Sequence, residues 1–348
     1  VYVALFASAF SAIAAIFYLA FIKRDVILEI QAKADEQFFA PVAVKNILLE
    51  LFVFALPYLL SVILSSRVAF VNMALLPNAL NAFGYDTATT QIYTSLITNE
   101  TLKLVGIPTV LATGFSVAVI PEMSQALVRN DYAVIRRNVR AAIESVLFIS
   151  LPFFLILFFM SDEVYFILFG GSSEIIKMGG AVTKVHVLYG IISILTPVIV
   201  SITMTLKLVR EAIVALALAF GFNFILLKPL VMKFGWSGSF IAAFIPTVFF
   251  ILAILYIIKR KYAVNFNYTY RRLLLMVIAS TALVLVYGAL RLVGLPVISL
   301  GKFFGLITLG IYSLAMLATY LFVSHIFMLP QVILNINFGS MIKRVLKR

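Results

Sequence analysis

Four polar residues lie in stretches of the sequence that are otherwise hydrophobic: Arg67, Asn72, Lys103 and Asn223. Guanidinium and ammonium groups bind phosphate through charge-assisted hydrogen bonds, and amides add further donors and acceptors. Ionisable groups in such surroundings are costly to bury, so they mark candidate functional sites. Together they indicate a binding site for an anionic, phosphate-bearing ligand.

Arg67 and Asn72 share one short segment, LSSRVAFVN, residues 64 to 72. At 100° per residue their side chains leave a straight helix about 140° apart. Both can therefore face one narrow cavity only if the helix breaks near Ser65 and Ser66. The charge favours Arg67 as the residue that faces the substrate and the family position described below favours Asn72, so both are kept as candidates.

Other kinds of chemistry find little support. The chain has no cysteine and only two histidines, which lie far apart, so we expect no metal site and no cofactor. No phosphate loop or nucleophile motif is found, and we expect no catalytic residue and no enzyme activity. The carboxylates within predicted spans lie near the ends of those spans, which argues against a relay for protons or a site for cationic drugs.

The composition is that of an integral membrane protein, with 64% hydrophobic residues, 12% charged residues and a mean hydropathy of +1.13. Stretches long enough to cross a membrane as a helix predict an all-α polytopic fold of about nine transmembrane helices. The predicted spans are 1 to 22, 47 to 77, 102 to 122, 141 to 160, 183 to 205, 210 to 232, 237 to 258, 272 to 292 and 304 to 329.

The net charge of +13 is attributed to asymmetric loops and not to nucleic-acid binding. Nineteen Lys and Arg residues fall on one side of the predicted spans and six on the other. The positive-inside rule then predicts a cytoplasmic C-terminus. The chain starts within a span, so we expect residue 1 to be a truncation point.

Several segments closely resemble the MurJ/SpoVB type of lipid-linked oligosaccharide flippase, within the multidrug/oligosaccharidyl-lipid/polysaccharide exporter superfamily. The resemblance covers most of residues 47 to 260. The segments are LVGIPTVLATGFSVAVIPEMSQALVRNDY (104 to 132), SLPFFLILFFMSDEVYFILFG (150 to 170), ALPYLL and LLPNALNAFGY (within 55 to 85) and FNFILLKPLVMKFGWSGSF (222 to 240).

The resemblance implies a two-lobe exporter of fourteen helices, of which this chain would supply spans six to fourteen. Residues 1–22 would be the last helix of the truncated N-terminal lobe, and 23–46 the cytoplasmic interlobe linker. Residues 47–260 would form the C-terminal six-helix lobe. Residues 261–348 would add two helices, which in such proteins form a groove for the lipid tail, and a basic cytoplasmic tail.

The resemblance also implies roles for particular residues. Family members carry an important basic residue five positions before the span-eight proline, and Lys103 stands five before Pro108. Asn72 stands where members often have Asp, and Leu227 follows Asn223 by four positions where sodium-binding members have an acid. These departures put a sodium site of that kind in doubt.

The predicted function is a flippase for polyprenyl-diphosphate-linked saccharides that works by alternating access in a bacterial cytoplasmic membrane. A peptidoglycan precursor is the first candidate and a polysaccharide unit the second. The expected partners are this lipid-linked oligosaccharide, membrane lipid and the missing N-terminal lobe. A multidrug or cation antiporter of the same superfamily, or a membrane scaffold in wall or spore assembly that transports nothing, stays open as an alternative.

Overall fold

The computed structural model describes residues 44–117, 120–294, 297–299 and 301–334, with Phe17, Tyr18, Phe21 and Arg24. It is 91% helical, and the described residues contain no strand. The predicted all-α polytopic fold is confirmed. The predicted first span, most of the predicted linker and the basic C-terminal tail lie outside the described residues.

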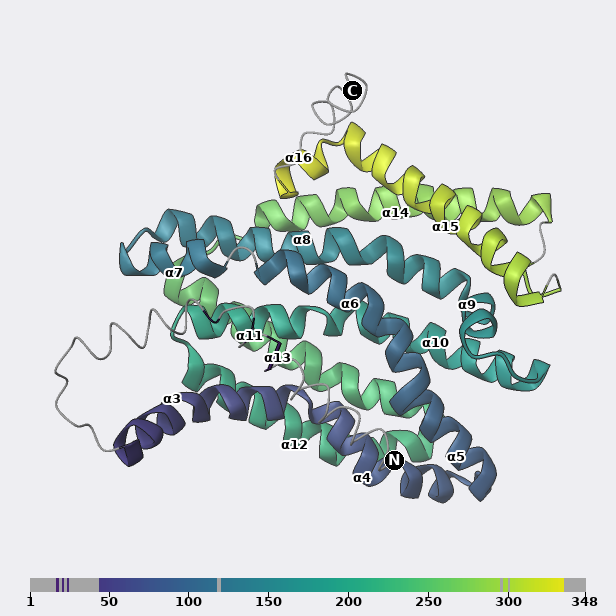
Figure 1. The fold of residues 1–348 in the computed structure, drawn as a ribbon, viewed down its shortest axis with the longest axis horizontal. Coiled ribbons are helices and arrows are strands. Elements are labelled where there is room, and N and C mark those ends of the chain that lie inside the picture. The colour runs from purple at the N-terminus through teal and green to yellow at the C-terminus, as the bar shows by residue number, and fades with distance from the viewer. Residues whose placement is uncertain are drawn as a thin grey trace. The chain divides into compact units, whose positions relative to one another are not determined.

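The helices follow one another with short connections (Figure 1). Their bounds are α3 Val44–Ser65, α4 Arg67–Phe83, α5 Thr87–Ser95, the π-helix η1 Leu96–Glu100, α6 Thr101–Val117, α7 Ile120–Val128, α8 Tyr132–Phe159, α9 Ser161–Leu168, α10 Ser173–Ser193, α11 Leu195–Thr205, α12 Val209–Phe234, the 3-10 helix η2 Gly235–Ser237, α13 Gly238–Tyr262, α14 Asn267–Val293, α15 Gly301–Ile326 and α16 Leu329–Leu334.

Five helical stretches of the described residues are long and apolar enough to cross a membrane, or six if the bent pair α3 and α4 is one span. One stretch, 209 to 262, is 54 residues long and would extend roughly 80 Å if straight. Instead η2 folds it into a hairpin whose two helices, α12 and α13, pack on each other. The predicted span at 183 to 205 is divided between α10 and α11, with Pro197 in the first turn of α11.

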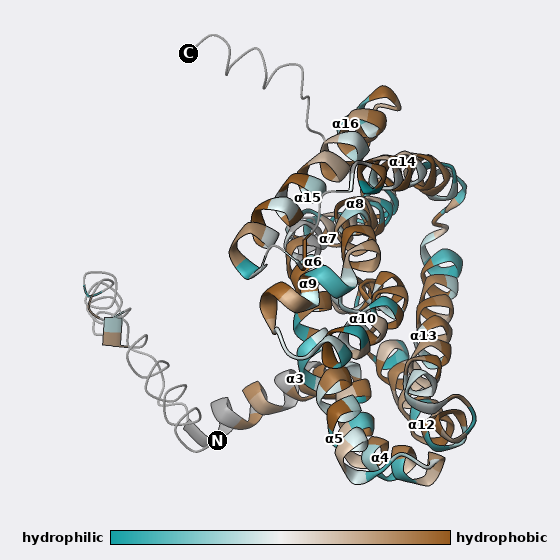
Figure 2. Cartoon of the chain, turned by 90° about the vertical axis from the view of Figure 1, so that its right-hand side faces the viewer, coloured by the Kyte–Doolittle hydropathy of each residue, from teal (hydrophilic) through white to brown (hydrophobic). Residues whose placement is uncertain are grey.

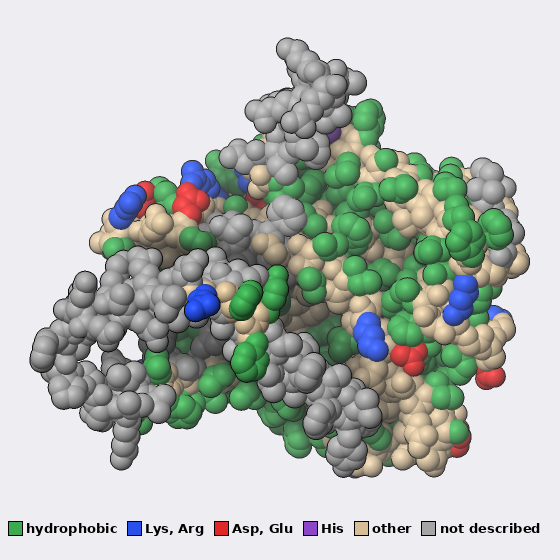
Figure 3. Space-filling model, viewed as in Figure 1, with side chains coloured by type: hydrophobic (Ala, Val, Ile, Leu, Met, Phe, Trp, Pro, Cys, Tyr) green, Lys and Arg blue, Asp and Glu red, His purple; other side chains and the backbone are tan. Residues whose placement is uncertain are grey.

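Helix α8 is the centre of the packing. It contacts α6, α10, α11 and α14, and 61% of its apolar stretch is buried inside the protein. Helices α14 and α15 form an antiparallel pair of which only 22% of each apolar stretch is buried. Hydrophobic residues occur along the length of the helices (Figure 2). Many of them are exposed on the face of the described residues that Figure 3 shows. This arrangement suits a lipid environment, in which exposed apolar side chains are not penalised.

The end of the bundle at which α8 and α14 begin and α13 ends is called the basic end below. Its defining residues are Arg136, Arg137, Arg140, Lys259, Arg260, Lys261, Arg271 and Arg272. The ion pairs there include Arg137 with Glu122 and Lys261 with Glu211.

The turn between α12 and α13 allows a sharp test of the hairpin. A methyl group added at Gly238 would lie 2.2 Å from the backbone oxygen of Leu230, too close for any real contact. We expect Gly238→Ala to destabilise the protein by about 1–3 kcal/mol, the usual range for overpacking. Fluorescence of Trp236, the single tryptophan, during denaturation in detergent reports this change directly.

Gly288→Ala is the matched control, because nothing lies within 4 Å of the added methyl on α14. We expect this variant to be neutral or more stable by up to about 1 kcal/mol, since alanine is the better helix former. Equal stability of the two variants would contradict the close approach of α12 and α13.

Candidate functional site

Arg67 begins α4 directly after a bend in the chain. Helices α3 and α4 differ in direction by 44° on either side of Ser66. The hydroxyls of Ser61, Ser65 and Ser66 each donate to the carbonyl four residues back, at 2.9, 2.6 and 3.1 Å. Such back-bonding bends helices. A break near Ser65 and Ser66 is therefore present, but it precedes both residues. Arg67 and Asn72 lie on one continuous helix, α4, so the break does not bring their side chains to one face.

The guanidinium of Arg67 is buried between helices. The residue is 1% exposed, and its Nη2 donates to Oγ1 of Thr247 on α13 at 2.6 Å. The hydroxyl of Thr247 in turn donates to the carbonyl of Ala243 at 2.7 Å. No carboxylate of the described residues pairs with Arg67, and its Nε has no hydrogen-bond partner there. A buried cation with one neutral partner is only partly compensated.

The two asparagines lie in helices that border the same interface. Asn72 on α4 is 5% exposed, and its Oδ1 has no partner among the described residues. Asn223 on α12 is fully buried, donates from Nδ2 to the carbonyl of Ala242 at 3.0 Å and leaves its Oδ1 without a partner there. Helix α4 packs against both α12 and α13, so these buried polar residues lie on three helices that contact one another, and Arg67 bonds directly to Thr247. The term seam below means Arg67, Asn72, Asn223 and Thr247.

Thr247 is the member of the seam that the sequence argument did not select. A usable signal existed, because Thr247 is the only hydroxyl residue between Ser239 and Tyr256 and it directly follows Pro246. A threonine of this kind can satisfy its own hydroxyl on its own helix, as Thr247 does. Only the packing of α13 against α4 showed that it also accepts a hydrogen bond from Arg67.

Lys103 lies apart from the seam, in the first turn of α6. It is exposed, and no ion pair or hydrogen bond from it is found in the part of the chain that the structure describes. The π-helix η1 directly precedes α6. Three of the four predicted site residues are thus buried on the packed helices α4 and α12, and the fourth is exposed on α6.

An apolar cavity of about 270 Å³ lies between α6, α8 and α15, and Lys103 is not among the residues that line it. Ile107 is four residues after Lys103, so the two side chains share one face of α6 about 6 Å apart along its axis. One face of α6 therefore carries the cation of Lys103 and, one turn later, a residue that lines the apolar cavity. The lining residues are Ile107, Pro108, Phe153, Ile156, Leu157, Ser313, Leu314 and Leu317.

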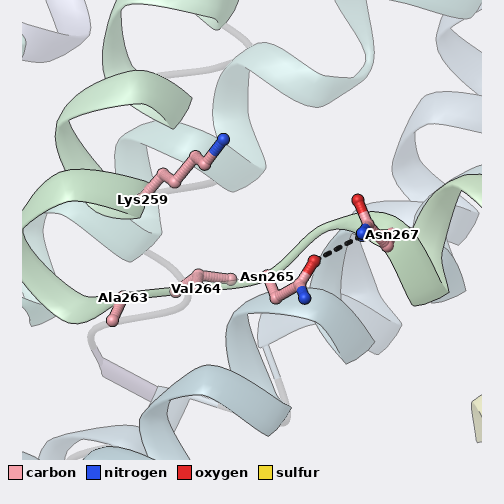
Figure 4. Close-up of a pocket in the computed structure, with 5 residues that line it drawn as sticks. All are labelled: Lys259, Ala263, Val264, Asn265 and Asn267. Carbon is pink, nitrogen blue, oxygen red and sulfur yellow. Dashed lines mark hydrogen bonds between the residues drawn. The ribbon is translucent and has the colours of Figure 1, made fainter.

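A second pocket, of about 380 Å³, opens at the basic end and is lined by Lys259, Ala263, Val264, Asn265 and Asn267 (Figure 4). Its floor is an Asn turn in which the backbone N–H of Asn267 donates to Oδ1 of Asn265 at 2.9 Å. Ammonium and amide groups of this kind can bind phosphate oxygens. None of the four predicted site residues lines this pocket.

Neither cavity has the ligands of a metal site. Among the described residues, no group of three His, Asp or Glu side chains is placed to hold a metal ion. His186 on α10 is buried, and its Nδ1 lies 2.7 Å from the hydroxyl of Thr101. That contact joins the start of α6 to α10, so the imidazole ring of His186 has a structural role in the packing of these helices.

The seam predicts a coupling between Arg67 and Thr247. Thr247→Val removes the acceptor of a buried guanidinium, and we expect a loss of about 1–3 kcal/mol in stability. In an Arg67→Met background, Thr247→Val leaves no buried charge without a partner, so we expect little further loss of stability. Denaturation followed by Trp236 fluorescence measures all four proteins of this double-mutant cycle.

Thr281→Val is the matched control, because Thr281 is exposed on α14 and its hydroxyl donates only to the carbonyl of Val277. We expect that variant to behave as the unmodified protein does. The same loss from Thr247→Val with and without Arg67 would rule out the coupling.

Comparison with known proteins finds one curated relative, the lipid II flippase MurJ of Bacillus subtilis (strain 168). The chain is 22% identical to it over 241 residues, which are 69% of this chain and 44% of that protein. The chain thus spans less than half of the relative's length. No family model matches the chain, and no solved structure does. The match confirms the resemblance to MurJ-type flippases that the sequence segments predict.

Proposed function

We propose that this chain takes part in moving a polyprenyl-diphosphate-linked saccharide across a bacterial cytoplasmic membrane. The observation that carries the proposal is that the exposed Lys103 lies one turn of α6 before Ile107, which lines the apolar cavity. A lipid-linked diphosphate has the matching chemistry, since its charged head and apolar chain are covalently joined. Lys103 binds the diphosphate and the cavity holds the first part of the chain.

The surroundings of Lys103 and the composition of the cavity walls support this assignment. Lys103 has no competing carboxylate among the described residues, so its ammonium is free to bind a diphosphate. Seven of the eight residues that line the cavity are apolar, and Ser313 is the exception. Apolar walls with few polar groups are what an isoprenoid chain requires. In this scheme the α14–α15 pair supplies the groove for the lipid tail.

The seam has a different role in the proposal. Arg67 is withdrawn between α4 and α13 in the present conformation, and the bend at Ser66 is the place at which α4 can swing. Such a movement would expose the guanidinium and the amides of Asn72 and Asn223 to the diphosphate. Hinges at the ends of helices are a common device of alternating access.

A buried carboxylate bears on the alternative of a cation antiporter. Glu144 is fully buried, but it accepts hydrogen bonds from Thr269 and Arg272. A carboxylate that is already paired with a guanidinium is a poor site for a transported cation. This pairing favours the flippase over the antiporter.

The relative's name makes lipid II, a peptidoglycan precursor, the first substrate to test, with other polysaccharide units second. We further propose the arrangement in which the basic end and the C-terminus are cytoplasmic, since cationic loops stay on that side. Residues 47–260 then form a C-terminal lobe, and residues 261–348 add the helix pair for the lipid tail and the basic tail. In the complete protein this chain acts together with an N-terminal lobe.

The test is flipping of labelled lipid-linked precursor by the complete protein that contains this chain, in depleted cells or in vesicles. We expect Arg67→Ala with Lys103→Ala to reduce flipping by about tenfold or more, because hydrogen bonds to charged groups contribute about 1.5–3 kcal/mol each. Lys103→Arg should retain most activity, since it keeps the cation.

Lys177→Ala is the matched control, because Lys177 is an exposed lysine on α10 that lines neither cavity. It should flip the precursor at the unmodified rate. Normal flipping by the double variant would sink the role of these cations. Failure of the unmodified protein to move any lipid-linked saccharide would favour the scaffold.

A further inference from the structure

Two ion pairs join α14 to the α8–α9 segment, one near each end of α14. Arg272 in the second turn of α14 pairs with Glu144 of α8. Arg291 in the last turn of α14 pairs with Glu163 of α9. The first pair lies toward the basic end and the second at the opposite end of the bundle.

Both carboxylates are buried, which separates these pairs from ordinary surface ion pairs. The side chain of Glu144 is 0% exposed and that of Glu163 is 7% exposed. Glu144 also accepts a hydrogen bond from the hydroxyl of Thr269 at 2.6 Å. Beside the second pair, the hydroxyl of Tyr287 donates to the carbonyl of Phe159 at 2.9 Å. Removing the arginine from such a pair leaves an uncompensated buried charge.

The spacing of the pairs matches the thickness of a membrane. Glu144 and Glu163 are nineteen positions apart, and so are Arg272 and Arg291. Nineteen residues of helix extend about 28 Å, close to the hydrocarbon core of roughly 30 Å. A spacing of this length would place the two pairs near opposite interfaces of a membrane that α14 crosses. The earlier carboxylate pairs with the earlier arginine and the later with the later, so α8 and α14 run in the same direction.

Apolar packing alone holds this helix pair weakly. Only 22% of the apolar stretch of α14 and of α15 is buried, and lipid tails are as apolar as leucine, so no hydrophobic effect drives these helices together in a membrane. Helix α15 is attached through Tyr320, which donates to the carbonyl of Phe148 on α8, and Tyr312, which donates to that of Leu290 on α14. Polar contacts thus fix the pair of helices in place.

The position of this helix pair sets the shape of the apolar cavity. Three of the residues that line it, Ser313, Leu314 and Leu317, belong to α15, and the others belong to α6 and α8. Separation of α15 from α8 would remove one wall of the cavity. We propose that the pairs Glu144–Arg272 and Glu163–Arg291 are positioning residues that clamp α14 and α15 onto α8 and α9 near both ends of α14 and so keep this wall in place against the lipid chain of the substrate.

This inference rests on the proposed function for the identity of the substrate, but the clamp itself is measured without transport. The chain has no cysteine, so spin labels attach only where cysteine is introduced. Labels at Ala133 and Tyr270, both exposed, report the distance between α8 and α14 at the basic end. Labels at Leu168 on α9 and Leu292 on α14, also exposed, report the distance between α9 and α14 at the other end.

In the complete protein in vesicles, we expect narrow distance distributions for both label pairs. Arg272→Gln with Arg291→Gln should broaden both, and adding Glu144→Gln with Glu163→Gln should narrow them again because no buried charge is left unpaired. Arg272→Lys with Arg291→Lys should also keep them narrow. Arg271→Gln is the matched control, since Arg271 is the exposed neighbour of Arg272 and has no carboxylate partner among the described residues.

Flipping of labelled precursor is measured on the same preparations. We expect the Arg272→Gln, Arg291→Gln protein to lose at least tenfold in rate and the double lysine variant to regain most of it. Unchanged distances in the double glutamine variant would overturn the clamp. Broadened distances with normal flipping would overturn its positioning role. If that variant does not fold, broad distances in the folded double lysine variant would equally overturn the clamp.

If the unmodified protein flips nothing, the proposed function fails, and the role of the clamp in holding a substrate's lipid chain fails with it. The distance measurements still decide in that case whether the ion pairs hold the helices. Failure of the proposed function is therefore seen in the flipping assay, and failure of the clamp is seen in the distances between the labels.

Discussion

A polar group inside a hydrocarbon layer has no water to bind, so it must find its partner within the protein. For the backbone this requirement is met by helices, and the described chain is helical nearly throughout. For side chains it is met by pairing across helices, and the seam and the two ion pairs of α14 are examples. Where every polar atom of a side chain has a partner, the pairing holds two helices together. Where an atom lacks a partner, the side chain retains the capacity to bind a ligand.

The contrast between Glu144 and Arg67 shows both outcomes. Glu144 has a guanidinium and a hydroxyl for its two oxygens, so nothing remains for a ligand to satisfy. Arg67 has one neutral hydroxyl for its Nη2 and no partner for its Nε among the described residues. The unpaired amide oxygens of Asn72 and Asn223 increase this shortfall. Buried polar groups left in this condition favour a second conformation in which they are satisfied.

The division of the structure into fastened and loosely held parts fits a transporter that must change shape. The hairpin α14–α15 is held by polar contacts at both ends and forms one wall of the apolar cavity. Helix α4 is joined to α3 through a bend that three serines stabilise and that a small change in backbone angles could alter. In the proposed mechanism the lipid chain lies against the held part while the charged head follows the part that moves.

The sequence by itself determined the fold class, because 64% hydrophobic residues in stretches of spanning length permit few structures other than a bundle of membrane helices. It also selected Arg67, Asn72 and Asn223, since polar residues stand out against an apolar background. It predicted nine spans, whereas the described residues contain five stretches that are long enough, or six with the bent pair. Two predicted spans, 210 to 232 and 237 to 258, fall in the single stretch 209 to 262, and the first predicted span lies outside the described residues.

Only the tertiary structure decided which polar residues meet. Thr247 accepts a hydrogen bond from a residue 180 positions away, and Glu144 pairs with one 128 positions away. No periodicity within a single helix encodes such contacts, because they depend on how helices rotate and cross when they pack. The apolar cavity one helical turn beyond Lys103 was decided in the same way, since α15 supplies one wall of that cavity and lies two hundred residues further along the chain.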